Sequence, residues 1–396
     1  MALSLSQNKL LNMKTAKTTI LMLLLLSLIS CKAETKKEVA IHSPVSKESP
    51  SSEHYIRVAL LLDTSNSMDG LIDQAKAQLW EIVNELSYAN CRNKRPNLEI
   101  ALYEYGNDKL SEKQDYIRKI LGFTQDLDEV SKELFSLTTD GGSEYCGAVI
   151  HSSLENLDWG NNSDDLKMIF IAGNEPFDQG TLNYKDAASN AKEKDIVVNT
   201  IFCGDYKHGV SSHWKDGATL TYGDYISINH NQQTVHIESP YDDPILQLNI
   251  KLNKTYVYYG RQGQSKATTQ YEQDDNAGSY GKANAVSRTV TKGSHLYKNG
   301  SWDLVDAEEE IVDFSYDKVK KEDLPDHLKD KSTSELKAYV AEQREERNKI
   351  QADINKLNEK RRLFILENKK DATNGLEDAM IKALKKQAKK KEYTWD

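Results

Sequence analysis

One short segment combines a carboxylate with two hydroxyls at a spacing that suits a metal ion. Asp63, Ser65 and Ser67 form an Asp-x-Ser-x-Ser motif that directly follows the apolar run 58–62. Their oxygen atoms are hard ligands, and a cation such as Mg²⁺ prefers oxygen ligands, few carboxylates and retained water molecules. The motif therefore predicts a cation site. The alternative interpretation is a strand-to-helix turn in which serine and aspartate act only as helix caps.

The elements around this motif predict where the site lies in the fold. Strands are expected at 56–62, 97–105, 116–123, 168–172, 196–203 and 222–228, and helices at 68–86, 127–137, 184–194 and 244–256. The runs 56–62 and 168–172 are almost wholly apolar, which is typical of strands buried on both faces of a sheet. The alternation predicts an α/β fold with a doubly wound, mostly parallel sheet. Such sheets bind ligands outside the carboxyl ends of their strands, which is where the motif falls.

A second loop supports the cation site through its likeness to a known family. Together with the motif at Asp63, a Gly-Gly-Ser segment that ends at Ser143 resembles the metal-ion-dependent adhesion site of von Willebrand factor A (VWA) domains. That family usually has Gly-Gly-Thr in this loop, and Ser143 keeps the hydroxyl. The resemblance implies a VWA-like domain over 54–260 that binds Mg²⁺, Mn²⁺ or Ca²⁺ through Ser143 and the three motif residues. It also implies a protein ligand whose acidic group completes the coordination.

The third loop departs from the pattern of that family. The family usually carries an aspartate after the fourth strand, and this chain has Gly173 at that position. An oxygen ligand from this loop would have to come from Asn174 or Glu175. Two hypotheses stay open from the sequence: one of these side chains replaces the aspartate, or the site binds metal weakly or not at all.

Binding rather than catalysis is the function that these residues predict. The chain has no Walker loop, no His-Glu-x-x-His motif and no nucleophile elbow, so we do not expect an enzyme. Its net charge is −9 over 396 residues with both signs interspersed, so no nucleic-acid partner is expected. The competing hypothesis is a structural or assembly lipoprotein whose metal site is non-functional and which acts through its C-terminal helix.

The first thirty residues predict a lipid anchor. Two lysines precede an apolar block at 20–29, which is too short to span a bilayer comfortably. The block ends in Leu-Ile-Ser before Cys31, which resembles a bacterial lipobox. We therefore expect a signal peptide over 1–31, starting at Met1 or Met13, and lipid on Cys31. A plain secretory signal or a short membrane anchor is the alternative.

This anchor implies a place in the cell. Lipid on Cys31 would hold the protein on a membrane of the bacterial cell envelope, facing the periplasm or the exterior. The following segment, 32–53, is rich in Lys, Glu, Ser and Pro and has few bulky apolar residues. It cannot bury a core and is expected to be a disordered tether.

The other three cysteines lead to a disulfide prediction. An envelope compartment is oxidising, so one bridge is expected. Cys146 begins a predicted helix and Cys203 ends a predicted strand, and these ends share one edge of a doubly wound sheet. Cys91 follows the first helix and lies at the opposite edge. A disulfide needs Cα atoms within about 7 Å, so we expect a bond between Cys146 and Cys203 and a free Cys91.

The C-terminal third is expected to extend the domain. The segment 261–330 is polar and should pack on the VWA-like domain or link from it, with a loop at 263–281. The segment 331–396 should be a long, coiled-coil-like helix with a basic tail, opened by a capping box between Ser332 and Glu335. Its apolar stripe is Leu336, Val340, Ile350, Ile354, Leu357 and Phe364, interrupted by Gln343, Arg347 and Arg361. This stripe is compatible with self-association or with packing against the chain's own domain.

Overall fold

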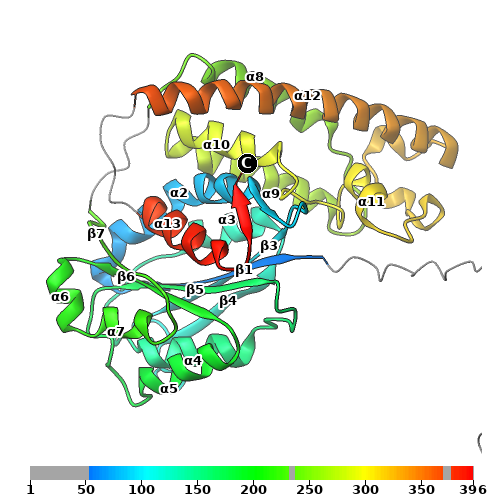
Figure 1. The fold of residues 1–396 in the computed structure, drawn as a ribbon. Coiled ribbons are helices and arrows are strands. Elements are labelled where there is room, and N and C mark those ends of the chain that lie inside the picture. Colours follow the sequence, from blue (N-terminus) through cyan, green and yellow to red (C-terminus); the bar gives the residue numbers. More distant parts are fainter. Residues whose placement is uncertain (1–52, 232–236, 369–375, 396) are drawn as a thin grey trace, which may run out of the picture. The chain divides into compact units, whose positions relative to one another are not determined.

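A six-stranded sheet lies at the centre of the computed structural model, which describes residues 53–231, 237–368 and 376–395 (Figure 1). The strand order is β4-β3-β1-β5-β6-β7. The strands are β1 (Tyr55–Asp63), β3 (Asn97–Tyr105), β4 (Ile117–Thr124), β5 (Leu166–Gly173), β6 (Val197–Cys203) and β7 (Tyr225–Ile228). All neighbours pair in parallel except β3 and β4, which are antiparallel. The predicted mostly parallel sheet is confirmed.

Helices cover both faces of this sheet because alternate residues of a buried strand point to opposite sides. Leu60 and Leu62 of β1 belong to the core on one face, and Ala59 and Leu61 belong to the core on the other. The first face is covered by α2 (Asp69–Ser87), α3 (Leu127–Ser136) and α13 (Leu376–Lys389). The second is covered by α4 (Cys146–Asn156), α5 (Tyr184–Glu193) and α7 (Trp214–Thr219), with α6 (Tyr206–Ser211) before α7.

The last helix and strand of the chain return to the sheet domain. The apolar side of α13 buries Leu376, Met380 and Leu384 in the same core as β1. After it, β8 (Tyr393–Trp395) pairs antiparallel with β2 (Ala89–Cys91). The domain is therefore completed by residues far beyond the predicted boundary at 260.

A helical layer connects β7 to α13 (Figure 1). Its helices are α8 (Asp242–Leu252), α9 (Gly263–Ser279), α10 (Lys282–Lys292), α11 (Leu304–Glu310) and α12 (Thr333–Asn368). Short 3-10 turns are η1 (Asn66–Met68), η2 (Glu112–Gln114), η3 (Asn253–Thr255), η4 (Tyr316–Lys318), η5 (Lys321–Asp323) and η6 (Asp326–Leu328). From Glu53 onward the chain forms one compact unit, so 261–330 and 331–396 are not separate bodies.

The prediction of a loop at 263–281 is wrong, since this segment is α9. The helix buries mostly polar side chains, with Ala277 as an apolar exception, so no apolar period marks it in the sequence. Gln270 donates a hydrogen bond to the Tyr297 hydroxyl at 3.1 Å. Gln273 accepts one from the Ser131 hydroxyl at 2.8 Å. Hydrogen bonds of this kind satisfy buried polar groups, and they let a hydrophilic helix pack.

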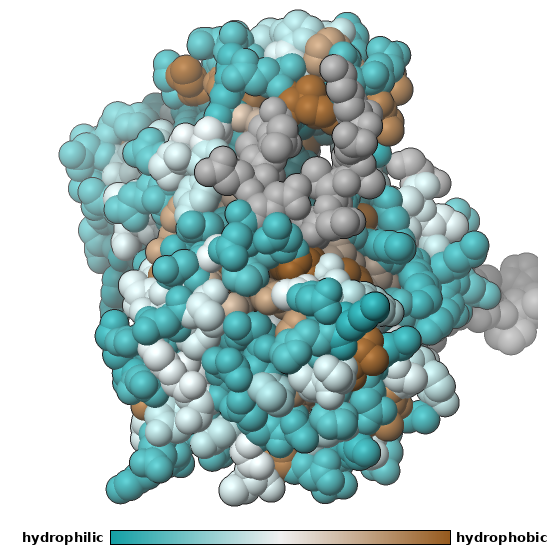
Figure 2. Space-filling model, turned by 90° about the vertical axis from the view of Figure 1, so that its left-hand side faces the viewer, coloured by the Kyte–Doolittle hydropathy of each residue, from teal (hydrophilic) through white to brown (hydrophobic). Residues whose placement is uncertain are grey.

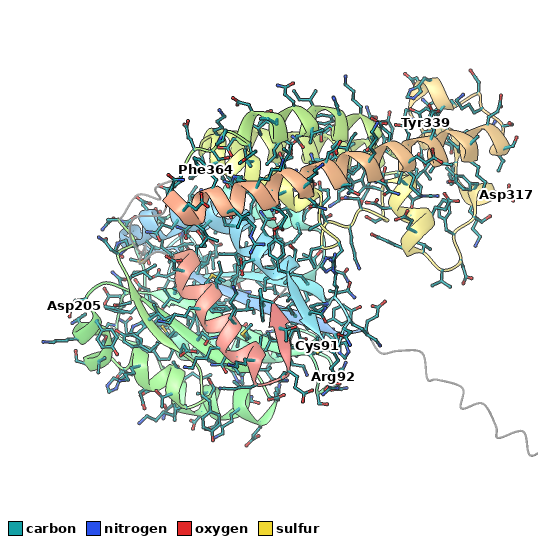
Figure 3. All side chains as sticks on the ribbon, turned by 45° about the horizontal axis from the view of Figure 1, so that its top comes forward. Cys91, Arg92, Asp205, Asp317, Tyr339 and Phe364 are labelled. Carbon is teal, nitrogen blue, oxygen red and sulfur yellow. The ribbon has the colours of Figure 1, made fainter. Side chains whose placement is uncertain are left out.

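The apolar stripe of α12 packs against the chain itself. Leu336 and Val340 are buried with Leu304 and Leu328, while Ile350 and Ile354 belong to a second cluster. The predicted capping box is confirmed, because the Ser332 amide donates to the Glu335 carboxylate at 2.8 Å and the Glu335 amide donates to the Ser332 hydroxyl at 3.3 Å. The four buried side chains of the stripe are covered within the chain, whereas Phe364 is half-buried and belongs to no apolar cluster of the described residues. Most of the stripe therefore packs against the chain's own domain. Figure 3 follows the helix between Tyr339 and Phe364.

Lysines of the basic tail form ion pairs with the sheet domain. Lys385 pairs with Glu85, Lys386 with Asp224, and Lys391 with Asp195 at 2.7 Å.

The predicted signal peptide, Cys31 and all of the tether except Glu53 lie outside the described residues. Within the described ranges, no helix combines the length and the apolar character that crossing a bilayer requires.

Candidate functional site

The Asp-x-Ser-x-Ser motif lies at the carboxyl edge of the sheet, where β1, β3 and β5 all end. Asp63 is the last residue of β1, and its Oδ1 accepts a 2.7 Å hydrogen bond from the Ser65 amide. The Thr64 amide donates to the Tyr105 carbonyl at 2.9 Å, which ties the motif to the end of β3. The Asp140 amide donates to the Thr64 carbonyl at 3.0 Å. Backbone bonds thus hold the first and second predicted loops together.

Two serines and an asparagine bring their polar atoms together at this edge. The hydroxyl oxygens of Ser65 and Ser67 are 3.2 Å apart. The amide of Asn174 approaches the Ser67 hydroxyl, with Oδ1 at 3.4 Å and Nδ2 at 3.1 Å. Ser65 is buried, whereas Ser67 is exposed, so the group opens to solvent on one side. The structure therefore joins the first predicted loop to the third through Asn174.

A further acid, which no sequence motif had indicated as a ligand, also lies here. Glu144 follows Ser143 on the second loop and is 4% exposed, and the neighbouring Asp63 is fully buried. Burial raises the pKa of both carboxyls, and the charge of Asp63 raises the pKa of Glu144 further. Hydrogen bonds from Ser65 favour the ionised form of each. Two buried carboxyls in contact cannot both ionise easily without a cation.

The third loop has no room for the aspartate that the family usually carries. A Cβ atom on Gly173 would lie 2.6 Å from the Tyr105 hydroxyl oxygen and 3.0 Å from Oδ2 of Asp63. The Tyr105 hydroxyl is held in this place by a 3.0 Å hydrogen bond to the Ala172 carbonyl. Glycine at 173 is therefore a requirement of this packing, and the loop contributes no carboxylate at that position.

The other two predicted residues lie beside this group. Ser143 is half-buried and immediately precedes Glu144 on the second loop. Glu175 is exposed, and its carboxylate accepts a 3.2 Å hydrogen bond from Gln179. The charge of Glu175 raises the pKa of Asp63 less than burial does. The structure thus favours Asn174 over Glu175 as the third-loop oxygen.

The donor set fits a hard divalent cation. Oδ2 of Asp63 is buried and has no hydrogen-bond partner among the described residues. Neither Asp63 nor Glu144 forms a salt bridge with any lysine, arginine or histidine that the structure describes. Hydroxyl, amide and carboxylate oxygens are the ligands that Mg²⁺, Mn²⁺ and Ca²⁺ accept. In the described part of the chain no three His, Cys, Asp or Glu side chains form a metal-holding group, so such a site depends on its serines and asparagine.

The predicted Cys146–Cys203 disulfide is wrong for this structure, in which both are free thiols. Both cysteines stand at the carboxyl edge as expected, but Cys203 belongs to the core on one face of the sheet and Cys146 to the core on the other. Cys146 instead contacts the Tyr105 hydroxyl at 3.8 Å. Cys91 is free and buried. In Figure 3 it lies near β8, well away from Asp205, which closely follows Cys203.

Comparison with protein families identifies the domain that carries this site. Residues 58–211 match the family model of the von Willebrand factor type A domain. The chain contains a VWA domain. The match includes the Asp63 motif, the second loop and the third loop, and the fold of the VWA domain is the mostly parallel sheet with flanking helices described above. None of the curated proteins compared with the chain matches it.

Solved structures give a distant likeness over less than half of the chain. Proximal thread matrix protein 1 from the mussel byssus is 14% identical over 44% of this chain, with a TM-score of 0.34, and the match covers 42% of that protein. Protein BatB from Bacteroides thetaiotaomicron is 17% identical over 44% of this chain and 90% of its own, with a TM-score of 0.34. An aerotolerance-related membrane protein from Bacteroides fragilis is 17% identical over 44% of this chain and 93% of its own, with a TM-score of 0.31.

Proposed function

We propose that the VWA domain is a binding module that takes a divalent cation at the carboxyl edge of its sheet and, through it, a protein ligand. Asp63, Ser65, Ser67 and Ser143 would hold the ion, with Asn174 at the rim. The ion would supply a positive centre for an acidic group of the ligand. The observation that carries this proposal is the buried, unpartnered Oδ2 of Asp63 beside the two serine hydroxyls.

The surroundings of the site suit a protein ligand better than a small molecule. Ser67 is exposed and Asn174 is half-buried, so the site opens at the surface. Figure 2 views the molecule from the side where β7 and α6 lie in Figure 1, and that face is mostly hydrophilic. A site that opens on a hydrophilic face is accessible to a protein ligand in solution. We therefore infer that the chain acts by binding and not by catalysis.

The cellular setting is part of the same proposal. A lipidated Cys31 would place the VWA domain on a membrane of the bacterial cell envelope, facing the periplasm or the exterior. The predicted segment 32–53 would give it reach from that membrane. The competing hypothesis, an assembly protein that acts through its C-terminal helix, loses support because four of the six apolar residues of the α12 stripe are buried within its own chain.

Calorimetric titration of the purified full-length protein with MgCl₂, MnCl₂ and CaCl₂ tests this function. The parent protein should bind at least one of the three, and Asp63→Ala should not. Ser211→Ala, which changes an exposed serine of α6, is the matched control and should bind like the parent. A parent protein that binds none of the three cations at millimolar concentration would overturn the proposed function.

A further inference from the structure

The carboxylate that Gly173 cannot provide has a replacement from another loop. We propose that Glu144 supplies the second carboxylate of the cation site. This inference rests on the proposed function and deepens it. It assigns a ligand, Glu144, that is not among the residues implied by the resemblance to VWA domains. It follows from three features of the structure.

First, there is space near the ends of β1 and β3 for the side chains of both Asp63 and Glu144. Gly106 follows β3 and has a positive φ of 78°, which favours glycine. A Cβ atom on this glycine would lie 2.6 Å from Cγ of Glu144 and 2.9 Å from Oδ1 of Asp63. The absence of a side chain at Gly106 thus leaves room for both acids at once. The Ser65 hydroxyl is within hydrogen-bonding reach of each of them.

Second, the other acids near this edge are already used or face solvent. Glu104 is buried, but its carboxylate pairs with Arg118 at 2.5 Å. Glu175 is exposed and bonded to Gln179. Asp140 is half-buried and pairs with Lys109 at 3.1 Å.

Third, Glu144 is nine-tenths buried and lacks a cationic partner among the described residues. A buried carboxyl beside a second carboxyl is costly unless a positive charge lies close to both. Oδ2 of Asp63 is also buried without a hydrogen-bond partner among the described residues, so this second observation favours cation binding at the same place. A divalent cation would balance the two carboxylates.

This assignment changes what the ion offers to a ligand. An ion whose charge is balanced by Asp63 and Glu144 attracts a ligand carboxylate less than an ion with a single carboxylate ligand. It is also held more firmly by the protein alone. We therefore expect cation binding to need no ligand, and the ion to remain on the free protein.

The test is calorimetric titration of the full-length protein with MnCl₂, comparing Glu144→Gln with Glu175→Gln. Glutamine keeps the size of Glu144 and removes its charge, and Glu175→Gln makes the same change at an exposed acid next to the site. Glu144→Gln should weaken binding by at least about tenfold, as loss of a ligand-shell group does at other metal sites. Glu175→Gln should stay within about twofold of the parent. Glu144→Asp keeps the charge but shortens the side chain, so its affinity for Mn²⁺ should lie between those of Glu144→Gln and Glu175→Gln. It replaces Glu144→Gln in this comparison if that variant does not fold.

The outcomes separate this assignment from the proposed function. Electron paramagnetic resonance of Mn²⁺ gives an independent count of bound ion for each variant. If the parent binds Mn²⁺ and Glu144→Gln binds it equally well, the assignment of Glu144 fails and the proposed function stands. If the parent itself binds no Mn²⁺, Mg²⁺ or Ca²⁺, the proposed function and the assignment both fail.

Discussion

At the scale of single residues, the chemistry centres on two buried acids of which the sequence revealed one. Asp63 could be predicted because it ends an apolar strand and shares a short motif with two serines. Glu144 could not, because its position after a Gly-Gly-Ser segment does not say in which direction its side chain points. The signal that was available is an acid between Ser143 and the helix that begins at Cys146. Only the fold shows that this acid turns inward to Asp63.

The acid pair predicts how stability depends on pH when no cation is present. The folded-state pKa of Glu144 is raised above its unfolded value of about 4.3. The contribution of Glu144 to stability is therefore fully present when the pH is below its unfolded-state pKa. It is lost as the pH rises through its raised folded-state pKa. In EDTA, the free energy of unfolding should fall between pH 5 and pH 9, and it should fall less in Glu144→Gln. Urea titrations at pH 5, 7 and 9 measure this, and identical pH profiles for the two proteins would contradict it.

The thiols give a second prediction at this scale. Because Cys146 and Cys203 belong to cores on opposite faces of the sheet, we expect both to stay reduced. Alkylation in denaturant without a reducing agent, followed by peptide mapping, should label Cys91, Cys146 and Cys203 alike. A cross-linked peptide that joins Cys146 to Cys203 would show that the sheet edge has a different arrangement.

At the scale of elements, the strands and helices of the sheet domain could be predicted and the polar helices could not. Apolar runs such as that of β5 and the helical spacing of α2 mark elements that pack by hydrophobic burial. By contrast, much of the packing of α9 and α10 uses buried polar and charged groups. Arg288 of α10 bonds to Asp128 at 2.8 Å and to Asp274 at 2.6 Å, and it is 1% exposed. A pattern of charged residues looks the same whether its members face solvent or each other.

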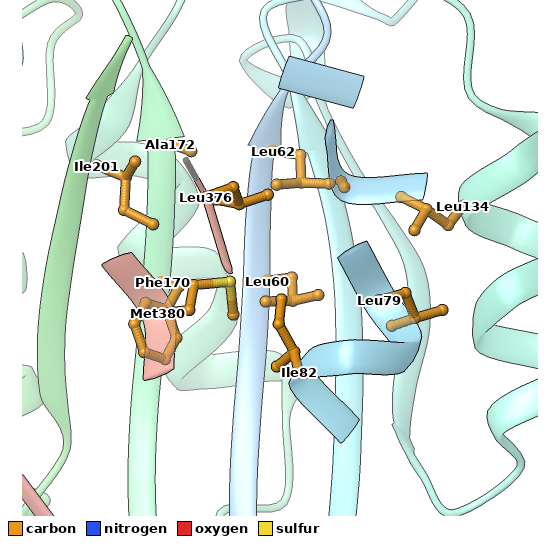
Figure 4. Close-up of a pocket in the computed structure, with 11 residues that line it drawn as sticks. Leu60, Leu62, Leu79, Ile82, Leu134, Phe170, Ala172, Ile201, Leu376 and Met380 are labelled. Atoms are coloured by element: carbon orange, nitrogen blue, oxygen red, sulfur yellow. The ribbon is translucent and has the colours of Figure 1, made fainter. Parts of the chain in front are cut away.

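The return of α13 to the sheet can be tested by a core substitution. Figure 4 shows Met380 and Leu376 of α13 at a small apolar cavity of about 20 Å³, with Leu60 and Phe170 across it. Met380→Ala enlarges this cavity, so the free energy of unfolding should drop by about 2–5 kcal/mol. Lys382→Ala changes an exposed residue of the same helix and should stay within about 0.5 kcal/mol. Equal stabilities in urea would mean that α13 does not cover the sheet.

The docking of α12 rests on a buried ion pair. Arg347 is 3% exposed, and its guanidinium lies 2.7 Å from Asp303 and 2.6 Å from Asp306. Arg347→Met leaves the buried Asp303 and the half-buried Asp306 without their cationic partner and should cost about 3–5 kcal/mol. Glu346→Ala, at an exposed position of the same helix, is the control. If Arg347→Met unfolds at the same urea concentration as the control, α12 does not pack as described.

At the scale of the whole molecule, the sheet domain that contains the VWA match is closed by the C-terminus of the described chain. The sequence predicted the doubly wound sheet, because alternation of strands and helices is a local pattern. It did not predict that residues 376–395 return to the sheet, because the contact joins segments about three hundred residues apart. The sequence also left open whether the stripe of α12 serves self-association or packing within the chain, and the fold shows that Leu336, Val340, Ile350 and Ile354 pack within it.

The proposed function depends on a divalent cation that Asp63 and its neighbours hold at the carboxyl edge of the sheet. The most direct measurement is the anomalous diffraction of crystals of the protein soaked in MnCl₂, recorded at the manganese edge. Cation binding at this edge predicts one strong peak within about 2.0–2.6 Å of oxygen atoms of Asp63 and Ser65, with Glu144 as a further ligand. Mn²⁺ bound only elsewhere on the protein, with no peak beside Asp63, would contradict it.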